Sequence, residues 1–363
     1  MRARTAPDPA IATGPGSGDF AARLVGWQKT HGRHDLPWQR STDPYRVWLS
    51  EIMLQQTQVA AVIPYYARFL ERFPSCEALA AASEEQVMQL WSGLGYYSRA
   101  RNLHKAARRI VELGGFPRER ADIEALPGIG RSTAAAIAAF SFGAREAILD
   151  GNVKRVLARH FAVPGYPGQK AVEERLWAIA ESLLPQQDIE SYTQGIMDLG
   201  ASLCARREPR CKACPVSATC QAAIAGNTAA YPEPKPSKPM PQRQTVMLVL
   251  QQGDTVLFEK RPSPGIWGGL WSFPEVPAGG DIALFCRDKL GCEIATPQAL
   301  APLLHGFTHF RLAIEPWQCV VTRRQPIAEE PGRAWLPLAT AAEAAVPVPI
   351  RKILNALRAG TTP

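Results

Sequence analysis

The sequence lacks any long apolar run, and it lacks an apolar core near its start. No segment approaches the ~18–20 consecutive apolar residues that a membrane-spanning helix requires. The first twenty residues are rich in proline, glycine and alanine and contain no stretch typical of a signal peptide. We therefore expect a cytoplasmic protein without membrane contact. Structural disulfides are rare in that reducing compartment, which weighs against pairing of the eight cysteines.

The composition favours a folded chain with a charged partner. The 363 residues are enough for two domains of ordinary size, and a hydrophobic content of 46% excludes global disorder. The formal net charge of +8 suggests a polyanionic partner. Charge alone does not identify that partner, because many basic proteins bind no nucleic acid.

The residue pattern divides the chain into four segments. Residues 1–18 predict a disordered tail, and residues 19–225 predict a mainly α domain because their apolar residues recur at helical spacing. Residues 226–243 are rich in proline and predict a stiff linker. Residues 244–358 alternate between strand-like and helical stretches, which predicts a smaller α+β domain.

Local signals place several element ends. Asp43 followed by Pro44 is typical of an N-cap with proline at the first helical position, and Ser83 with Gln86 matches a capping box. Residues 245–261 predict two strands around a Gly-Asp turn. These signals agree with a helical first domain and a sheet in the second.

The stretch LPGIGRSTAAAIAAF, from Leu126 to Phe140, combines two glycines with a run of small residues. Gly128 and Gly130 allow a tight turn and a close approach of the backbone to a partner. We expect a helix to begin at about Arg131, and its first N–H groups and positive dipole end would suit a phosphate. An ordinary tight turn between two helices is the alternative.

Two carboxylates occupy positions that predict diverging pKa values. Glu51 lies in VWLSEIMLQQTQVA, where apolar neighbours would flank it on a helix and desolvation would raise its pKa, as a general acid at neutral pH requires. Asp150 follows an apolar stretch and precedes a helix, whose dipole and N–H groups would keep it ionised. A pair split in this way suits acid and anion roles. A solvated helix glutamate and a simple N-cap aspartate are the alternatives.

Four cysteines lie close together in a short basic stretch, CARREPRCKACPVSATC, at positions 204, 211, 214 and 220. Zinc sites usually carry two closely spaced cysteine pairs separated by a longer arm, whereas only Cys211 and Cys214 form such a pair here. A compact run of four thiolates without histidine suits a 4Fe–4S cluster at least as well. The residues alone leave zinc and iron–sulfur open. The basic side chains in the stretch could contact phosphates.

Several motifs in order resemble one protein family. VWLSEIMLQQTQV, GLGYYSRARNLHKAA, LPGIGRSTA, LDGNVKRVLAR and the cysteine stretch are similar to the MutY family of adenine DNA glycosylases, in the helix–hairpin–helix superfamily that includes endonuclease III. The resemblance is strong over residues 20–225 and looser over 244–355. It implies a monomeric enzyme of base excision repair that removes adenine paired with 8-oxoguanine or guanine in double-stranded DNA.

The resemblance also implies a cofactor and roles for single residues. The loop at 204–220 would hold a 4Fe–4S cluster, which decides against zinc. Glu51 would be the catalytic acid and Asp150 the second carboxylate. The residues that would contact the DNA or surround the flipped nucleotide are Trp38, Gln56, Tyr96, Asn152 and the hairpin Leu126 to Gly130, with Gly128 at its turn; the ligands of the cluster would be Cys204, Cys211, Cys214 and Cys220.

Ser132 separates this chain from the endonuclease III branch of the superfamily. That branch has a lysine here, which forms a Schiff base with the sugar, and a serine cannot form that imine. The resemblance therefore implies a monofunctional glycosylase with little or no lyase activity.

The second domain resembles the Nudix hydrolase fold. A working Nudix enzyme needs a metal-binding helix rich in glutamate, and PEVPAGGDIALFCRDKLGCEI lacks closely spaced glutamates. We therefore expect a recognition domain rather than a pyrophosphatase. HGFTHFRL resembles the family's Phe-Ser-His loop for 8-oxoguanine, with Phe307, Thr308 and His309 at the three positions. The alternatives are a plain strand here and, for the whole chain, a non-catalytic DNA-binding or redox module, which would need neither carboxylate.

Overall fold

The computed structural model describes residues 17–236, 239–262, 265–277 and 279–359. Residues 1–16 of the expected tail and residues 237 and 238 of the expected linker lie outside this part. The chain divides into two compact units, Met1–Ala80 with Lys105–Ser237 and Ala81–His104 with Lys238–Pro363. The second unit thus includes residues that we expected in the helical domain, and the domain limits taken from the sequence stay a prediction.

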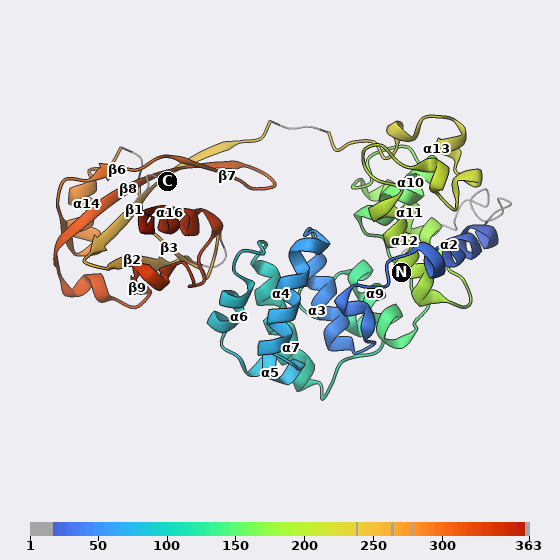
Figure 1. The fold of residues 1–363 in the computed structure, drawn as a ribbon, viewed down its shortest axis with the longest axis horizontal. Helices are drawn as coiled ribbons and strands as arrows, with labels where there is room; N and C mark the ends of the chain where they lie inside the picture. Colours follow the sequence, from blue (N-terminus) through green and yellow to red (C-terminus); the bar gives the residue numbers. More distant parts are fainter. Residues whose placement is uncertain (1–16, 237–238, 263–264, 278, 360–363) are drawn as a thin grey trace, which may run out of the picture. The chain divides into compact units, whose positions relative to one another are not determined.

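The first two thirds of the described chain are helical, as predicted (Figure 1). The α-helices there are α2 (Ser17–His31), α3 (Pro44–Leu54), α4 (Val59–Arg72), α5 (Cys76–Ala81), α6 (Glu84–Trp91), α7 (Ser98–Glu112), α8 (Arg120–Glu124), α9 (Arg131–Phe142), α10 (Gly151–His160), α11 (Lys170–Ser182), α12 (Ile189–Ser202) and α13 (Gln221–Ile224). Short 3₁₀ turns are η1 (Pro37–Arg40), η2 (Cys211–Ala213), η3 (Ser217–Thr219) and η4 (Thr228–Ala230).

The capping signals in the sequence are confirmed. The Asp43 side chain accepts hydrogen bonds from the first backbone N–H groups of α3, with Pro44 at the first helical position. Ser83 forms a capping box with Gln86 at the start of α6. The apolar pattern after Pro44 is not one helix, because the chain breaks at 55–58, where Gln56 has a φ of +56°.

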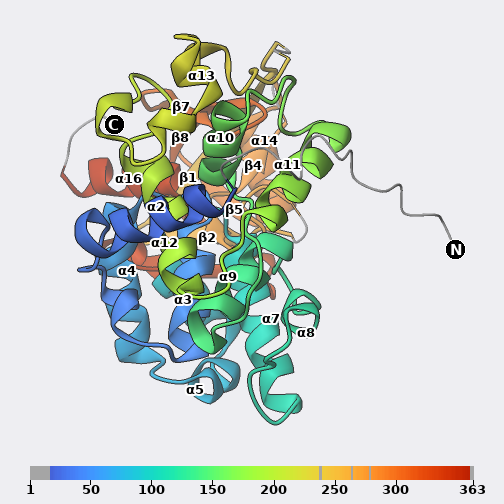
Figure 2. The ribbon, with the colours of Figure 1, turned by 90° about the vertical axis from the view of Figure 1, so that its right-hand side faces the viewer.

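Helix α9 is central to the first unit. It contacts α3 on one side and α8 and α12 on others, and α12 also packs against α2 and α10 (Figure 2). The alanines from Ala134 to Ala139 are buried. Such small side chains let neighbouring helices approach closely, and Gly200 of α12 serves the same purpose, since a Cβ there would lie 2.6 Å from the Cβ of Asn152. This packing brings the N-terminus of α10 beside α12.

A mixed sheet forms the core of the second unit. Its nine strands among the described residues are β1 (Gln242–Gln252), β2 (Thr255–Lys260), β3 (Trp271–Ser272), β4 (Glu275–Val276), β5 (Cys292–Ile294), β6 (Gln298–Ala299), β7 (Leu303–Gly306), β8 (Arg311–Arg324) and β9 (Arg333–Pro337). The main order is β3-β2-β1-β8-β5. β1 and β8 pair in parallel, with Gln242 opposite Arg311, and the other pairs are antiparallel. β1 and β2 form the predicted hairpin, with Gln252 opposite Thr255.

Helices flank this sheet (Figure 1). They are α14 (Ile282–Leu290), α15 (Leu338–Ala341), α16 (Val348–Arg358) and the 3₁₀ turn η5 (Pro326–Glu329). Leu248 and Leu250 of β1 pack with Cys286 and Leu290 of α14 in one apolar core. The predicted α+β class of this domain is confirmed. Within the described part of the chain, no helix has the length and apolar character needed to cross a membrane.

Candidate active site

A cavity of about 600 Å³ opens among helices of the first unit. This volume falls within the ~300–1,000 Å³ typical of ligand pockets. The fold brings six of the residues singled out from the sequence to its lining: Trp38, Glu51, Gln56, Ser132, Asp150 and Asn152. They come from η1, α3, the turn after α3, α9 and the start of α10.

Glu51 lies on α3, and the residues around it on that helix, Val47, Trp48 and Ile52, are buried. Burial, and after it the charge of Asp150, raises the pKa of Glu51 to about 7. The direction predicted from the apolar neighbours is therefore confirmed. A carboxyl group with this pKa holds its proton near neutral pH and can still donate it, as a general acid must.

Asp150 is the N-cap of α10, and its Oδ1 accepts a hydrogen bond of 2.8 Å from the Val153 N–H. We predicted that this position would lower its pKa. The prediction is wrong, because burial raises the pKa of Asp150 by more than the helix N-terminus lowers it. The N–H groups of Val153 and Asn152, with two nearby cations, offset the burial only in part.

The two carboxyls still differ in the groups that surround them. The Asp150 anion has backbone N–H donors and the cations Arg155 and Lys154 to stabilise it, whereas ionisation of Glu51 is opposed by the charge of Asp150. Burial therefore favours the protonated form of Glu51, and the charge of Asp150 favours it further. The N–H groups and cations around Asp150 favour its anion and oppose the effect of burial.

Two residues expected to contact DNA have strained backbones. Gln56 and Tyr96 have φ values of +56° and +50°, a region that residues other than glycine rarely occupy. Such strain clusters at functional sites. Gln56 is exposed and lines the cavity, whereas Tyr96 is exposed and belongs to the second unit. Neither expected role is tested by this geometry.

The Ser132 hydroxyl joins α9 to the segment before Asp150. Its Oγ accepts a hydrogen bond of 2.9 Å from the Leu149 N–H. Because Asp150 is the next residue, this bond helps to fix the position of the Asp150 carboxylate in the cavity. Ser132 thus has a structural role, and it also lacks the amine that a lysine would place at this position.

The glycine hairpin has the predicted form. Gly128 takes a φ of +80°, which a residue with a side chain adopts only with strain, and α9 begins at Arg131 with Gly130 as its N-cap. Leu126 and Ile129 are buried, so their side chains anchor the turn from inside. The hairpin therefore has a fixed shape and presents its backbone outward.

The four cysteines of the 204–220 stretch line one small cavity together with Arg159 and Val216. All four are free thiols and partly exposed. Within the described part of the chain, no three His, Cys, Asp or Glu side chains are arranged so that they could hold a metal ion. The structure thus gathers the thiols around one point without forming a ligand shell.

The donor chemistry of this loop fits a thiolate-bound metal group. Burial raises the pKa of Cys214 to about 11, and the charges of the other three thiols raise it further. A hydrogen bond from a backbone N–H lowers this pKa only in part. Thiols that close together are costly to ionise without a cation among them. The cavity lining includes no carboxylate and only one histidine, His160, so sulfur dominates the donor set.

Two arginines of α10 attach the cysteine loop to that helix, whose first residues line the cavity that contains Glu51. Arg155 donates from Nε to the Cys204 carbonyl (2.8 Å) and from a terminal nitrogen to Asn152 Oδ1 (2.9 Å). Arg159 donates to the carbonyl of Ala205 (2.7 Å) and to Cys204 Sγ (3.3 Å). The loop and the start of α10 therefore share one hydrogen-bonded network.

In the second unit, Phe307, Thr308 and His309 lie at a turn between β7 and β8. The Phe307 N–H donates to the Phe310 carbonyl (2.9 Å), which closes the turn and excludes a continuous strand. Thr308 and His309 are exposed at its tip. The Phe307 ring stacks on Phe310, with ring centres 4.4 Å apart, and lies 5.6 Å from Trp267. The tip of the turn is therefore exposed, and the rings of Phe310 and Trp267 pack against its Phe307.

Comparisons with known proteins agree with this architecture. Residues 49–182 match the family model described as HhH-GPD superfamily base excision DNA repair protein, and residues 245–356 match the NUDIX domain model. An adenine DNA glycosylase of Buchnera aphidicola is 36% identical over 342 residues, covering 93% of this chain and 97% of the relative. The chain belongs to the adenine DNA glycosylase family.

For two other similar proteins the aligned region covers a smaller share of one of the two chains. The human adenine DNA glycosylase is 33% identical over 93% of this chain and 73% of its own length. The solved structure of a thermostable thymine-DNA glycosylase is 30% identical, has a TM-score of 0.53 and covers 58% of this chain and 97% of that one. Relatives named for adenine thus match both parts of the chain, whereas the thymine enzyme matches little more than half.

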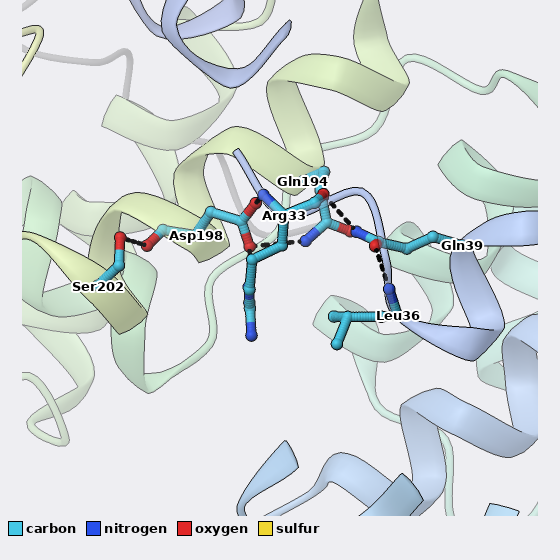
Figure 3. Close-up of polar contacts among 6 residues, drawn as sticks. All are labelled: Arg33, Leu36, Gln39, Gln194, Asp198 and Ser202. Atoms are coloured by element: carbon cyan, nitrogen blue, oxygen red, sulfur yellow. Dashed lines mark hydrogen bonds and ion pairs between the residues drawn. The ribbon is translucent and has the colours of Figure 1, made fainter. Parts of the chain in front are cut away.

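The sequence did not single out several residues of the cavity in this adenine DNA glycosylase family member. Arg33, Gln39 and Gln194 line it, and the buried Asp198 accepts hydrogen bonds from Arg33 and Gln194 (Figure 3). Asp198 lacked the signal that identified Glu51, because its neighbours three and four positions away on the helix are glutamine, glycine, alanine and serine. Its partner Arg33 is too distant in the sequence for a local pattern to pair the two.

Proposed function

We propose that this protein is an adenine-specific DNA glycosylase that hydrolyses the N-glycosidic bond of adenine paired with 8-oxoguanine or guanine. The observation that carries the proposal is Glu51, whose pKa burial raises to about 7, in one cavity of about 600 Å³ with Asp150. Membership of the family supplies the base and the repair context. Release of free adenine from such a duplex, measured by chromatography of the products, tests the proposal; no release would contradict it.

The reaction requires the adenine to leave the duplex. A base inside a DNA stack is out of reach, so the nucleotide must turn out into the cavity at a cost of a few kcal/mol. Gln56, exposed beside the cavity, would fill the gap in the stack. The hairpin from Leu126 to Gly130 would hold a phosphate of the backbone through its N–H groups.

Bond cleavage then divides between the two carboxyls. Glu51 would give its proton to adenine N7, which makes the base a better leaving group. The sugar develops oxocarbenium character as the bond breaks, and the Asp150 anion would stabilise that positive charge. Asn152, next to Asp150 and fixed by Arg155, would position the nucleotide. Water completes the hydrolysis, and Ser132 offers no amine for a Schiff base, so we expect no efficient lyase step.

The pH profile should follow the Glu51 proton. Because the acid form of Glu51 is the active one and burial raises its pKa to about 7, excision should fall about tenfold per unit above that pH. Excision should also fall on the acid side, where Asp150, whose pKa is raised by burial, takes up a proton and loses its charge. Single-turnover excision rates on either side of pH 7 measure this. A rate that rises through neutral pH would instead indicate that Glu51 acts as a base.

A 4Fe–4S cluster would occupy the cysteine loop. Cys204, Cys211, Cys214 and Cys220 would each bind one iron, and the cluster would cross-link the loop through iron–thiolate bonds. Arg155 and Arg159 already hold the loop against α10, so we assign the cluster a structural role in fixing the loop beside that helix.

Metal content tests the cluster directly. The purified protein should be brown and contain about four irons per chain, and Cys211→Ser should lose most of that iron. Cys76→Ala removes a cysteine outside the loop and should keep it. A colourless protein with one zinc per chain would overturn the assignment.

The turn with Phe307, Thr308 and His309 would read the opposite base. Adenine is a normal base, so selection of the damaged pair must come from its partner. Thr308, where the family's loop has serine, keeps a hydroxyl that can donate to or accept from a purine edge, and Phe307 offers an aromatic face. No run of glutamates supports a pyrophosphatase in this domain.

Replacing this turn should weaken the preference for the damaged pair. Phe307→Ala with Thr308→Ala in the full chain should lower the rate ratio for adenine opposite 8-oxoguanine over adenine opposite guanine by about tenfold, or ~1.4 kcal/mol. Leu304→Ala, an exposed change on β7 outside the turn, is the matched control. Unchanged discrimination in the double variant would place the reading of the opposite base elsewhere.

A further inference from the structure

Residues 265–270, between β2 and β3, form a turn that packs against the side chains beside Thr308. We call it the tryptophan turn, because the buried Trp267 is its main side chain. The ring centre of Trp267 lies 5.6 Å from those of His305 and Phe307. His305 also meets Phe307 edge to face, with the ring centres 4.7 Å apart. The position of the Phe307 ring therefore depends on where the tryptophan turn places Trp267.

The tryptophan turn has a strained backbone. Trp267 has a φ of +55°, a region that a bulky residue rarely occupies, and Gly269 has a φ of +77°. Such a conformation persists only where its surroundings fix it. Inside the turn, the Gly268 N–H donates to the Gly265 carbonyl (3.2 Å). The carbonyl of Gly268 belongs to a buried residue and also needs a hydrogen-bond partner.

Arg101 supplies that partner from another part of the chain. It lies in the first turn of α7, and its guanidinium donates a hydrogen bond to the Gly268 carbonyl. A hydrogen bond from a charged donor is stronger than one from a neutral donor. The bond therefore holds the backbone directly after the strained Trp267.

The segment that carries Arg101 is itself attached to the sheet domain. Residues 81–104, which include α6 and the start of α7, belong to the same compact unit as the sheet. The Ser92 hydroxyl donates to the Val346 carbonyl (3.0 Å), and Arg351 of α16 donates to that hydroxyl (2.6 Å). Arg101 thus contacts the tryptophan turn from a segment that other hydrogen bonds already hold in place.

We propose that Arg101 is a positioning residue for reading the opposite base, because it holds the tryptophan turn in the shape that keeps Trp267 against Phe307. This inference rests on the proposed reading of 8-oxoguanine by Phe307 and Thr308. The choice of the opposite base then depends on an arginine that lies 167 positions before Gly268, in the part of the sequence assigned to the helical domain. Loss of this arginine should affect discrimination between 8-oxoguanine and guanine more than the chemistry at Glu51.

Arg101→Met tests the proposal, because methionine favours a helix and cannot donate to the Gly268 carbonyl. In single-turnover assays on duplexes with adenine opposite 8-oxoguanine or opposite guanine, the ratio of the two rates should fall by about fivefold. Arg109→Met is the matched control. It makes the same change later on α7, at an exposed arginine that pairs with Glu112 (3.1 Å), and it should keep the wild-type ratio.

A combined variant shows whether Arg101 acts through the turn with Phe307 and Thr308. Arg101→Met should lower the ratio no further when it is added to Phe307→Ala with Thr308→Ala, because the ring that Arg101 helps to position is already absent. A full additional loss in the triple variant would show that Arg101 acts elsewhere, and the proposal would be overturned.

The remaining outcomes separate this inference from the function on which it rests. If Arg101→Met leaves the ratio unchanged or slows excision from both duplexes equally, Arg101 does not position the reading of the base and the proposal is overturned. If that variant does not fold, Arg101→Gln, whose shorter side chain withdraws the donor, must lower the ratio instead, and an unchanged ratio overturns the proposal. If Phe307→Ala with Thr308→Ala keeps full discrimination, the proposed reading of 8-oxoguanine fails, and this inference fails with it.

Discussion

Glu51→Gln should reduce adenine excision by ~10²–10⁴-fold, the range that general acid catalysis contributes. The amide keeps the size and shape of the side chain on α3 but has no proton to give to the base. Binding of the duplex should change little, because the substitution leaves the hairpin and the basic side chains of the 204–220 stretch untouched. Single-turnover excision and a gel-shift titration of the same protein measure the two effects separately.

The control for this variant is Glu71→Gln. It makes the same chemical change on α4, at an exposed residue that does not line the cavity. It should excise adenine at the wild-type rate. If Glu51→Gln keeps more than about a hundredth of that rate, general acid catalysis by Glu51 is wrong.

Asp150→Asn should lower the excision rate by ~10²–10³-fold, because it removes the anion that would stabilise the positive sugar. A second effect distinguishes this role from a mere loss of the N-cap. The charge of Asp150 contributes to the raised pKa of Glu51, so the remaining activity should decline at a lower pH than in the wild type.

The pH profile of Asp150→Asn supplies the critical comparison. Asparagine is itself a good N-cap, so the helix α10 should begin where it does now and the melting temperature should change little. A variant with wild-type excision would remove Asp150 from the chemistry. A slow variant whose profile is unshifted would show that its charge does not reach Glu51.

The features that the sequence could predict are those with local causes. Helix starts at Pro44 and Glu84 depend on residues within three positions, and both capping patterns are confirmed. The raised pKa of Glu51 follows from apolar neighbours on its own helix, and its direction is confirmed. The glycine hairpin before Arg131 is likewise a short-range pattern.

The features that could not be predicted depend on packing between distant segments. The depth of Asp150 is set by α12 and α9 as well as by its own helix, so burial outweighs the helix N-terminus and reverses the expected direction of its pKa. The bond between Arg33 and Asp198 joins residues that are 165 positions apart. The strained φ of Gln56 marks a break between two helices that the apolar pattern alone did not reveal.

The cysteine loop lies between these cases. Its spacing predicts a metal-binding stretch, and the fold gathers Cys204, Cys211, Cys214 and Cys220 at one small cavity. The choice between zinc and iron came from the resemblance, because both metals accept four thiolates. Metal analysis of the purified protein decides between zinc and iron.

The central claim is best tested by a strand-cleavage assay on a duplex with one adenine opposite 8-oxoguanine, labelled on the adenine strand. A duplex with thymine opposite guanine is the control, since a thymine-DNA glycosylase is among the similar structures. We predict a cut strand from the adenine duplex only after treatment with alkali, and no cut in the thymine duplex under either condition. Cleavage without alkali, or removal of thymine in preference to adenine, would contradict a monofunctional adenine glycosylase.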